Sequence, residues 1–504
     1  MKAVMVMYDS LKRDLMSCFG GPVKTPNFER LQKHTVTFDK SYVGSLPCMP
    51  ARRELHTGRY NFLHRSWGPV EPFDDSMPEI LKKKGIYTYL ATDHYHYVED
   101  GGCTYHTRYS GWNVNRGQES DGWVADLTPH AEGFAPNMLS PQTMTGTLRA
   151  FRMAGSWQSM HNREKLHSEK DYPMHMTFDD GMDFLNRNGK FDNWFLQIET
   201  FDPHEPFVSP ESFQNGFLSP DEQASPDWPP YAKVCEDKET IEKMRKKYYS
   251  LLTFCDQQLG RVLDKMDEMD LWKDTMLIVN TDHGFVLGEH DWWGKGNMPN
   301  YEELVHTPLF IWNPLTGKKD CHCDRLVQTI DLAPTLLEYF GAEIPKDMTG
   351  IPLRKVIEDQ ALTRDYALFG YHGGPVCITD GRYVLMRAVA DFTQDAYEYT
   401  LMPTHMRNFF TVDEMKTTEL HEPFSFTKGM PVMKIKGLVN QRYANAQAEG
   451  DDLLFDLKTD PKELNPIENE EVKNRLLKMI GRIACENEAP DELYRRYKLE
   501  KPEA

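Results

Sequence analysis

The stretch Ala3-Val4-Met5-Val6-Met7-Tyr8-Asp9 places an acidic residue directly after a short apolar run. Short apolar runs are typical of strands that are buried on both faces of a parallel sheet. Four more runs of this kind occur, at residues 86–91, 194–198, 276–280 and 309–312. Helical patterns separate them, so the sequence predicts an α/β fold with a large mixed, mostly parallel sheet sandwiched by helices.

Two helices of this domain can be placed from the sequence. The longest is predicted over Lys238 to Met269, with an apolar stripe at three- and four-residue spacing that indicates core packing: Leu252, Cys255, Leu259, Val262 and Met266. A second helix is predicted near Asp331 to Phe340. Asp331 would be its N-cap, and it would end before Gly341.

The pattern changes after residue 365, where shorter strand candidates begin. They lie at residues 366–371, 376–379, 382–386 and 453–457, and a terminal helix is predicted at 470–485. We therefore expect a catalytic domain at 1–365 and a smaller C-terminal α+β subdomain at 366–504 that contains an antiparallel sheet. Residues 101–172 are polar with little periodicity, and we interpret them as a long insertion that shapes the active site.

Composition restricts the class of protein. The 58 Lys and Arg residues against 77 Asp and Glu residues give a formal charge of −19, which repels polyanions, so no nucleic-acid partner is expected. No window reaches the roughly 20 apolar residues of a membrane-spanning helix, and the start of the chain is acidic too early for a signal peptide. We expect a cytoplasmic protein with no membrane partner.

The nine cysteines are scattered along the chain, and most are expected to be reduced. The spacing of Cys321-His322-Cys323 does not suit a metal site, so we predict a loop there. The stretch from Asp491 to Lys498 could dock on a neighbouring copy or fray, which leaves a homo-oligomer open.

The most informative motif is Cys48-Met49-Pro50-Ala51-Arg52, which is followed by Thr57-Gly58-Arg59. Further motifs follow in a characteristic order: Thr25-Pro26-Asn27, Asp202-Pro203-His204, Thr281-Asp282-His283-Gly284, Gly288-Glu289-His290, Gly294-Lys295, Asp331-Leu332-Ala333-Pro334-Thr335 and Leu454-Phe455-Asp456-Leu457. Over nearly the whole chain this order resembles that of the type I sulfatases of the alkaline phosphatase superfamily. The resemblance implies an alkaline phosphatase-like fold and a sulfuric ester hydrolase. It also implies that a formylglycine-generating or sulfatase-maturing enzyme oxidises Cys48 to formylglycine.

The chemistry of sulfate esters explains why such a residue is useful. A sulfate ester is an anion, so its attack needs cations at the sulfate oxygens and a nucleophile held in line. A hydrated aldehyde is a geminal diol, in which one oxygen attacks sulfur and the other later expels the sulfate by re-forming the aldehyde. We predict hydrolysis of an organic sulfate monoester, on a small molecule or a saccharide, to an alcohol and inorganic sulfate.

By resemblance, Asp9, Cys48, Asp282 and His283 bind one divalent metal. Hard oxygen ligands make Ca²⁺ the first choice, and the imidazole leaves Mn²⁺ or Mg²⁺ open. Sulfatases commonly have a second Asp where this chain has Ser10. The stretch from Asp9 to Asp14 is instead similar to that of phosphonate monoester hydrolases, so hydrolysis of a phosphonate monoester or phosphodiester is the alternative function. A non-catalytic binding protein with unconverted Cys48 is a third hypothesis.

The remaining candidate catalytic residues are Arg52, Lys295, His204, His94 and His96. Arg52 lies one turn beyond Cys48 if a helix begins at Pro50, so it could orient the diol, whereas Arg53 is expected at the surface. Lys295 and His204 would bind the sulfate oxygens, and His204 would protonate the leaving alcohol if its pKa lies near neutrality.

The segment Thr92-Asp93-His94-Tyr95-His96 stands where many sulfatases have a Lys and a His two residues apart. Two-residue spacing puts either Asp93 and Tyr95 or His94 and His96 on one face. We favour the two histidines, because groups that are cationic or transfer protons suit an anionic substrate. The alternative is that they belong to a loop that lines the substrate.

Overall fold

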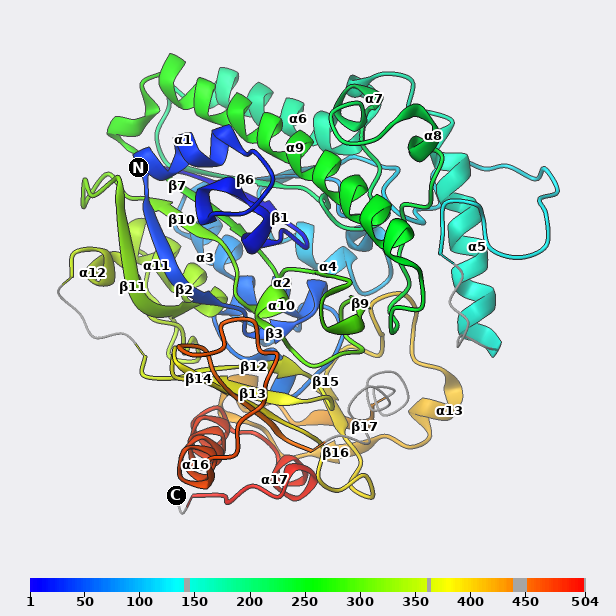
Figure 1. Ribbon diagram of the computed structural model, residues 1–504. Helices are drawn as coiled ribbons and strands as arrows, with labels where there is room; N and C mark the ends of the chain where they lie inside the picture. Colours follow the sequence, from blue (N-terminus) through cyan, green and yellow to red (C-terminus); the bar gives the residue numbers. More distant parts are fainter. Residues whose placement is uncertain (140–145, 360–363, 438–450, 503–504) are drawn as a thin grey trace.

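The main sheet has eight strands and forms the centre of the molecule (Figure 1). The structure, a computed structural model, describes residues 1–139, 146–359, 364–437 and 451–502. The strand order is β11-β2-β10-β7-β1-β6-β4-β5. The strands are β1 (Lys2–Tyr8), β2 (Val36–Tyr42), β4 (Tyr87–Thr92), β5 (Gly111–Val114), β6 (Trp194–Glu199), β7 (Thr275–Thr281), β10 (Leu309–Trp312) and β11 (Cys321–Gln328). The predicted mixed, mostly parallel sheet is confirmed.

Strand β1 is central because it separates two cores. Val4, Val6 and Tyr8 face one apolar cluster, whereas Ala3 and Met5 face another. Side chains alternate across a strand, so an uninterrupted apolar run buries both faces of the sheet. Helices α1 (Pro26–His34), α6 (Pro173–Asn188) and α9 (Lys238–Glu268) pack on the first face. Helices α2 (Cys48–Thr57), α3 (Met77–Lys83) and α11 (Leu332–Tyr339) pack on the second.

The predicted stripe of α9 is confirmed, since all five of its side chains are fully buried. Asp331 precedes α11 as predicted, but its carboxylate does not cap that helix. It accepts hydrogen bonds from the backbone N–H groups of Gln328 and Ile351 instead.

Two strand predictions were wrong. The run at 309–312 was predicted as a parallel strand, but β10 is antiparallel to both β2 and β7. A parallel strand needs a crossover connection, and only two short strands, a 3₁₀ turn and the single-turn helix α10 (Glu302–Val305) lie between β7 and β10. Cys321-His322-Cys323 was predicted as a loop, but it begins β11 and pairs in parallel with β2. Both cysteines pack against the core, and His322 is exposed.

A smaller sheet carries the C-terminal part of the chain, as the fold class predicted. Its order is β18-β14-β13-β12-β3. The strands are β12 (Ala367–Tyr371), β13 (Val376–Thr379), β14 (Tyr383–Arg387), β18 (Leu453–Asp456) and β3 (Ser45–Leu46). The two residues of β3 pair in parallel with β12. Because only Pro47 separates β3 from Cys48, the chain segment that carries Cys48 is held between the two sheets.

Other C-terminal elements were predicted in part. Helix α16 (Glu470–Glu486) matches the predicted terminal helix. A three-stranded sheet, β15 (Tyr397–Thr400), β17 (Val432–Lys436) and β16 (Glu419–His421), was not predicted. The stretch after Pro490 neither frays nor extends away, since α17 (Asp491–Tyr497) buries Leu493, Tyr494 and Tyr497 against its own chain.

Residues 101–172 contain an element that the sequence did not reveal. Helix α5 (Gly146–Arg163) stands at one side of the molecule (Figure 1). Its buried face includes Ser156, Ser159 and Asn162. The fully buried residues are therefore polar, whereas the apolar Trp157 and Met160 are only partly buried, so apolar periodicity does not mark the buried face of this helix.

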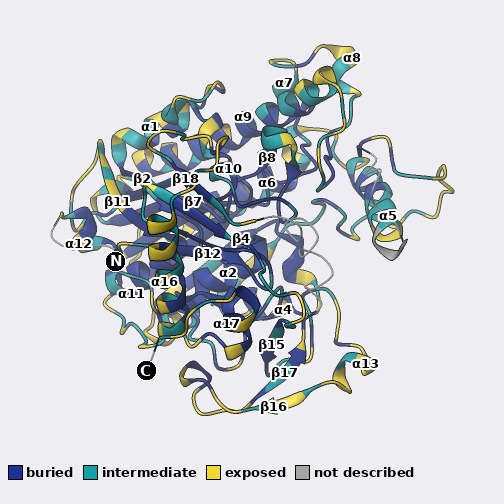
Figure 2. Cartoon of the chain, turned by 60° about the horizontal axis from the view of Figure 1, so that its bottom comes forward, coloured by how far each residue is buried: buried dark blue, intermediate teal, exposed yellow. Residues whose placement is uncertain are grey.

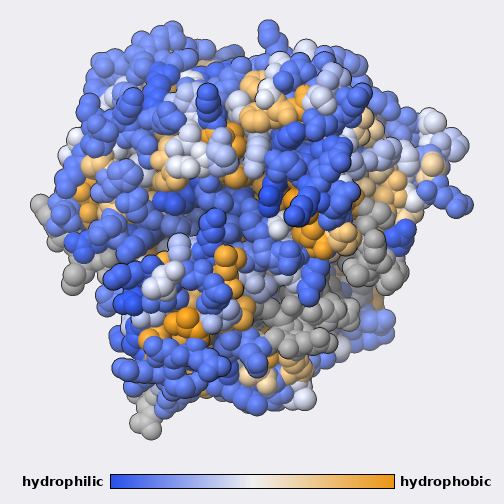
Figure 3. Space-filling view, in the orientation of Figure 1, coloured by the Kyte–Doolittle hydropathy of each residue, from blue (hydrophilic) through white to orange (hydrophobic). Residues whose placement is uncertain are grey.

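The surface agrees with the composition. Figure 2 shows buried residues along the central strands, with exposed residues gathered on outer elements such as α8 (Pro220–Gln223) and β16. The face in Figure 3 is mostly hydrophilic. Within the described ranges, no helix combines the length and the apolar character that crossing a bilayer requires.

Candidate active site

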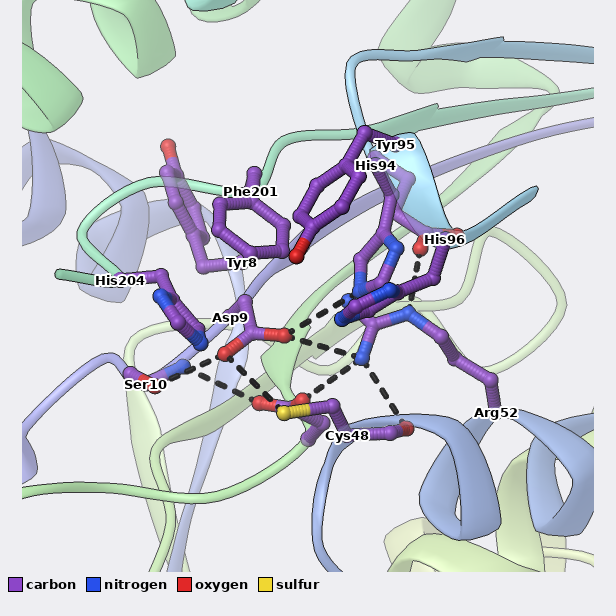
Figure 4. Close-up of polar contacts among 12 residues, drawn as sticks. Tyr8, Asp9, Ser10, Cys48, Arg52, His94, Tyr95, His96, Phe201 and His204 are labelled. Atoms are coloured by element: carbon purple, nitrogen blue, oxygen red, sulfur yellow. Dashed lines mark hydrogen bonds and ion pairs between the residues drawn. The ribbon is translucent and has the colours of Figure 1, made fainter. Parts of the chain in front are cut away.

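Polar side chains meet at the carboxyl edge of the main sheet, where parallel strands commonly build sites. Asp9 follows β1, Asp282 and His283 follow β7, and Glu199 is the last residue of β6. Cys48 is the first residue of α2. Figure 4 shows Asp9, Cys48 and Arg52 directed toward one another from these elements. The structure therefore brings together residues that lie more than 200 positions apart in the sequence.

Cys48 is enclosed by polar and charged groups. Its Sγ lies 3.2 Å from Lys295 Nζ, 3.4 Å from His283 Nε2 and 3.9 Å from Asp9 Oδ1. The side chain is 1% exposed, and burial together with the charge of Asp9 raises the pKa of its thiol well above the usual value. An unmodified Cys48 would therefore be a neutral thiol and a poor nucleophile.

The four predicted metal ligands form one group. Asp9, Cys48, Asp282 and His283 each offer a ligand atom, and these atoms lie within 4.8 Å of one another. The Nδ1–H of His283 donates to the carbonyl of Gly284 at 2.8 Å, which leaves its Nε2 lone pair directed at the group. Asp9 Oδ2 is buried and forms an ion pair with Arg52, but it accepts no hydrogen bond of good geometry from the described residues. This donor set fits a divalent cation.

Electrostatics favour a cation at the same place. Burial and the charge of Asp9 raise the pKa of Asp282 to about 7. Burial would also raise the pKa of Asp9, but the charges of Lys295 and Arg52 hold it well below its usual range. Two buried carboxylates at close range oppose each other's ionisation. A bound cation would remove that penalty and keep both ionised.

Arg52 links the acidic residues of the site and is fully buried. Its Nη1 lies 3.0 Å from Asp9 Oδ2 and 2.7 Å from Asp282 Oδ2, and its Nε donates to Glu199 Oε1 at 2.6 Å. The helix begins at Cys48 and not at Pro50, but four residues still separate Cys48 from Arg52, and Arg52 Nη1 donates to the Cys48 carbonyl.

Arg53 is not at the surface as predicted. It is 4% exposed and forms a bidentate ion pair with the buried Asp74. Every residue of α2 is buried, so the helix has no exposed face on which Arg53 could lie.

Ser10 takes part in the polar network although it carries no charge. Its hydroxyl donates to Asp9 Oδ1 at 2.8 Å and accepts from Lys295 Nζ at 2.9 Å. The Ser10 N–H donates to Asp282 Oδ1 at 3.1 Å. A serine at this position therefore preserves the hydrogen bonding but gives the group one carboxylate fewer.

His204 lies beside the site, but its protonation differs from the prediction. Burial, followed by the charge of Lys295, lowers the pKa of His204 well below its usual value, and not toward neutrality. Its Nδ1–H donates to the carbonyl of Glu205 at 2.5 Å. Nε2 is therefore the unprotonated nitrogen near pH 7. In this state Nε2 of His204 can accept a proton or a hydrogen bond but cannot supply one.

The segment after β4 places both favoured histidines near the site. His94 Nε2 lies 3.5 Å from Asp9 Oδ2, and His96 lines the pocket beside Cys48. Asp93 accepts from the backbone N–H of Phe201 at 2.7 Å, and the Tyr95 hydroxyl donates to Glu119 at 3.0 Å. The backbone is not extended here, since residues 95–98 form a 3₁₀ turn.

A pocket opens beside Cys48, His204 and Lys295. Its other lining residues are Pro47, Trp67, His96, Glu119, Phe151, Arg152, Tyr231, Gly296 and Arg407. Most of these were not predicted, because they come from loops and from α5, where no motif or spacing marks them. Glu199 could have been found, since it follows a buried apolar run just as Asp9 does.

The sulfatase family model matches residues 2–342, more than half of the chain. The chain belongs to the sulfatase family. A second model, for the C-terminal part of N-sulphoglucosamine sulphohydrolase, matches residues 288–428 of this sulfatase. It is therefore an enzyme that hydrolyses sulfate esters, as predicted. The family as a whole uses a divalent metal and formylglycine.

This sulfatase is similar to several characterised relatives. It is 24% identical over 395 residues to an arylsulfatase of Clostridium perfringens, with 73% of this chain and 81% of the relative covered. It is 21% identical over 465 residues to an N-acetylglucosamine-6-O-sulfatase of Bacteroides thetaiotaomicron, with 81% and 82% covered.

Two solved structures share the fold of this sulfatase. A protein in complex with its substrate D-glucosamine-2-N,6-O-disulfate has a TM-score of 0.63 at 16% identity, with 99% of this chain and 98% of that chain covered. The phosphonate monoester hydrolase of Agrobacterium radiobacter has a TM-score of 0.64 at 17% identity, with 97% and 96% covered.

The burial of Arg52 and Arg53 predicts different outcomes for two neighbouring substitutions. Arg52→Ala would leave Asp282 and Glu199 buried without their counter-charge, so the free energy of unfolding in metal-free protein should fall by about 3–5 kcal/mol. Activity of the folded fraction should fall by about 10²–10³-fold. Arg53→Ala is the matched control, because it also breaks a buried pair but outside the pocket.

Urea unfolding and kcat at a temperature where both variants are folded test this. Arg53→Ala should lose stability and retain most of its kcat. If both variants lost kcat equally, the direct role of Arg52 in the site would be contradicted.

Proposed function

We propose that this sulfatase hydrolyses a sulfate monoester of a small molecule or saccharide, with formylglycine at position 48 and a divalent cation bound by Asp9, Asp282, His283 and residue 48. One observation carries the proposal. Cys48 Sγ lies 3.2 Å from Lys295 Nζ within a group of four ligand atoms, at the edge of a pocket. A free thiol with a raised pKa would serve this site poorly, whereas an oxygen nucleophile would suit it.

Each chemical requirement of the reaction has a candidate residue. The hydrated aldehyde supplies two hydroxyl groups on one carbon, one to bond to sulfur and one to release the sulfate later. A divalent cation supplies positive charge and makes a nearby hydroxyl more acidic. Residue 48 is also the first residue of α2, so the positive end of the helix dipole faces the sulfate.

Three side chains act around that centre. Lys295 would bind a sulfate oxygen, because its ammonium group stays charged: the charge of Asp9 raises its pKa well above the usual value despite burial. Arg52 would hold Asp9 and Asp282 in place from the rear of the site. His204 presents an unprotonated Nε2, so it would accept a proton from a hydroxyl of residue 48 and afterwards return it to the leaving alcohol.

Ca²⁺ is our first choice of cation, with Mn²⁺ and Mg²⁺ as alternatives. Two carboxylates and the oxygens of hydrated formylglycine favour a hard ion, whereas His283 and the replacement of a second Asp by Ser10 make the set less selective. We also propose His94 and His96 as groups that position Asp9 and the substrate, respectively.

The size of the pocket suggests the class of substrate. The pocket beside Cys48 is small, which suits a small substrate better than a polymer. The relatives are named as an arylsulfatase and an N-acetylglucosamine-6-O-sulfatase, which is consistent with a small substrate.

The cysteines suggest the compartment. None of the nine cysteines forms a disulfide, which is typical of the cytoplasm. Cys48 would need a formylglycine-generating enzyme in the same compartment.

Hydrolysis of a phosphonate monoester or phosphodiester is the second candidate. Ser10 favours it, because this position differs from the common sulfatase pattern, and phosphonate monoester hydrolases are among the structures that share the fold. Steady-state kinetics with one aryl leaving group as sulfate, phosphate monoester, phosphate diester and phosphonate monoester distinguish the two. The highest kcat/KM should be for the sulfate, and a higher value for any phosphorus ester would overturn the proposal.

Lys295→Ala tests the sulfate-binding role. The variant should lose about 10²–10³-fold in kcat/KM, because one buried cation at the sulfate oxygens is removed. Its midpoint of thermal unfolding should change less than that of Arg52→Ala, since Lys295 contacts only one carboxylate. Lys273→Ala, at an exposed lysine, is the control. Normal kinetics in Lys295→Ala combined with a large drop in stability would assign Lys295 a structural role only.

A further inference from the structure

The pocket beside Cys48 has a positive lining in a strongly negative protein. It is lined by Lys295, Arg152 and Arg407 and by a single carboxylate, Glu119, whereas the chain as a whole carries a formal charge of −19. A sulfate monoester has one negative charge, and Lys295 lies where its sulfate would bind. The two arginines are therefore not explained by the reacting group.

Arg152 is mostly buried, and it makes no hydrogen bond to another described residue. Its side chain is 11% exposed, and its guanidinium lies over the ring of Tyr231, 4.9 Å from the ring centre. The nearest carboxylate oxygen is Glu119 Oε1 at 3.7 Å, too long for a hydrogen bond. No described residue accepts a hydrogen bond from this guanidinium, although it carries five N–H donors. N–H donors that lack acceptors away from solvent cost free energy. Their presence here indicates a ligand that supplies the acceptors.

Arg407 reaches the same pocket from another part of the chain, the loop between β15 and α13 (Val412–Met415). Its Nη2 donates to the Tyr95 hydroxyl at 3.1 Å, and its Nε lies 3.3 Å from Glu99 Oε1. Its guanidinium lies 5.2 Å from the centre of the Phe151 ring, the residue next to Arg152. The charges of Arg152 and Arg407 repel each other, so an anion bound by both would relieve that repulsion.

Aromatic side chains form another part of the wall. Trp67, Phe151 and Tyr231 line the pocket together with the two arginines. Flat apolar walls with a few polar groups are typical of sites that bind a ring and fix its orientation. A guanidinium pairs with a carboxylate or a sulfate through paired, charge-assisted hydrogen bonds.

We propose that Arg152 and Arg407 form a second anion subsite, and that the substrate is a ring compound with another carboxylate or sulfate besides the sulfate that is cleaved. Arg152 and Arg407 are thus specificity-determining residues. The assignment of the cleaved group rests on the proposed function. The subsite itself can be tested by binding alone.

Three ring sulfates test the subsite: 3-carboxyphenyl sulfate, its neutral isostere 3-carbamoylphenyl sulfate, and 1,3-phenylene disulfate. Calorimetry on the Cys48→Ala protein with Ca²⁺ gives Kd without turnover, and kcat/KM is measured on the unsubstituted enzyme. The carboxylate should be preferred over the carboxamide by at least about tenfold, the usual effect of one charge-assisted pair. The disulfate distinguishes a preference for sulfate from one for carboxylate.

The variants Arg152→Gln and Arg407→Lys are compared with the control Arg149→Gln. Each substitution is made in the Cys48→Ala protein for Kd and in the otherwise unsubstituted enzyme for kcat/KM. Arg149 is on the same helix, over the Phe134 ring, and does not line the pocket. The preference for the carboxylate over the carboxamide, as a ratio of affinities or of kcat/KM, should fall toward one in Arg152→Gln. It should fall several-fold in Arg407→Lys, because lysine lacks the planar guanidinium that donates paired hydrogen bonds. It should stay unchanged in Arg149→Gln.

The outcomes separate this inference from the proposed function. A ratio near one for the unsubstituted pocket, or a ratio that survives Arg152→Gln, would overturn the subsite even if sulfate is hydrolysed. If none of the sulfates were hydrolysed but the Kd ratio remained and was lost in Arg152→Gln, the subsite would stand and the proposed function would fall.

Discussion

The site depends on the compensation of buried charge. Asp9, Asp282 and Glu199 are at most 1% exposed, and the fully buried Arg52 forms an ion pair with each of them. Burying carboxylates in this way is costly unless each has a partner. Arg52 and Lys295 supply part of that compensation, and the raised pKa of Asp282 indicates that more positive charge is needed. A divalent cation meets this need, so the same imbalance that would destabilise an empty site makes it bind metal.

The architecture explains how such a cluster is assembled. The carboxyl ends of β1, β6 and β7 supply acids from three distant parts of the chain, since these strands are parallel neighbours. Residue 48 comes from the other side, because β3 pairs with the C-terminal sheet and only Pro47 separates β3 from the start of α2. Residue 48 is thus held between two sheets, while most of the pocket wall comes from α5 and from loops.

Sequence reasoning succeeded where a physical pattern was local. The uninterrupted apolar runs of β1 and β7 predicted buried strands, and the acids that follow them lie together in the structure. It failed for α5, because the fully buried residues of that helix, such as Ser156, are polar. It also failed for β10, because the direction of that strand depends on the connection before it. The ionisation of His204 could not be predicted, because it depends on burial and on Lys295, which is distant in sequence. Arg152 and Arg407 carry no spacing signal at all.

The central claim is that side chain 48 becomes an aldehyde within a cation-binding group. The most direct test is mass spectrometry of the tryptic peptide that contains residue 48, from protein produced in its own host and shown to hydrolyse sulfate esters. The account predicts that the active protein carries the aldehyde, or its hydrate, in place of the thiol at position 48. Active protein in which position 48 is uniformly an unmodified thiol would contradict it.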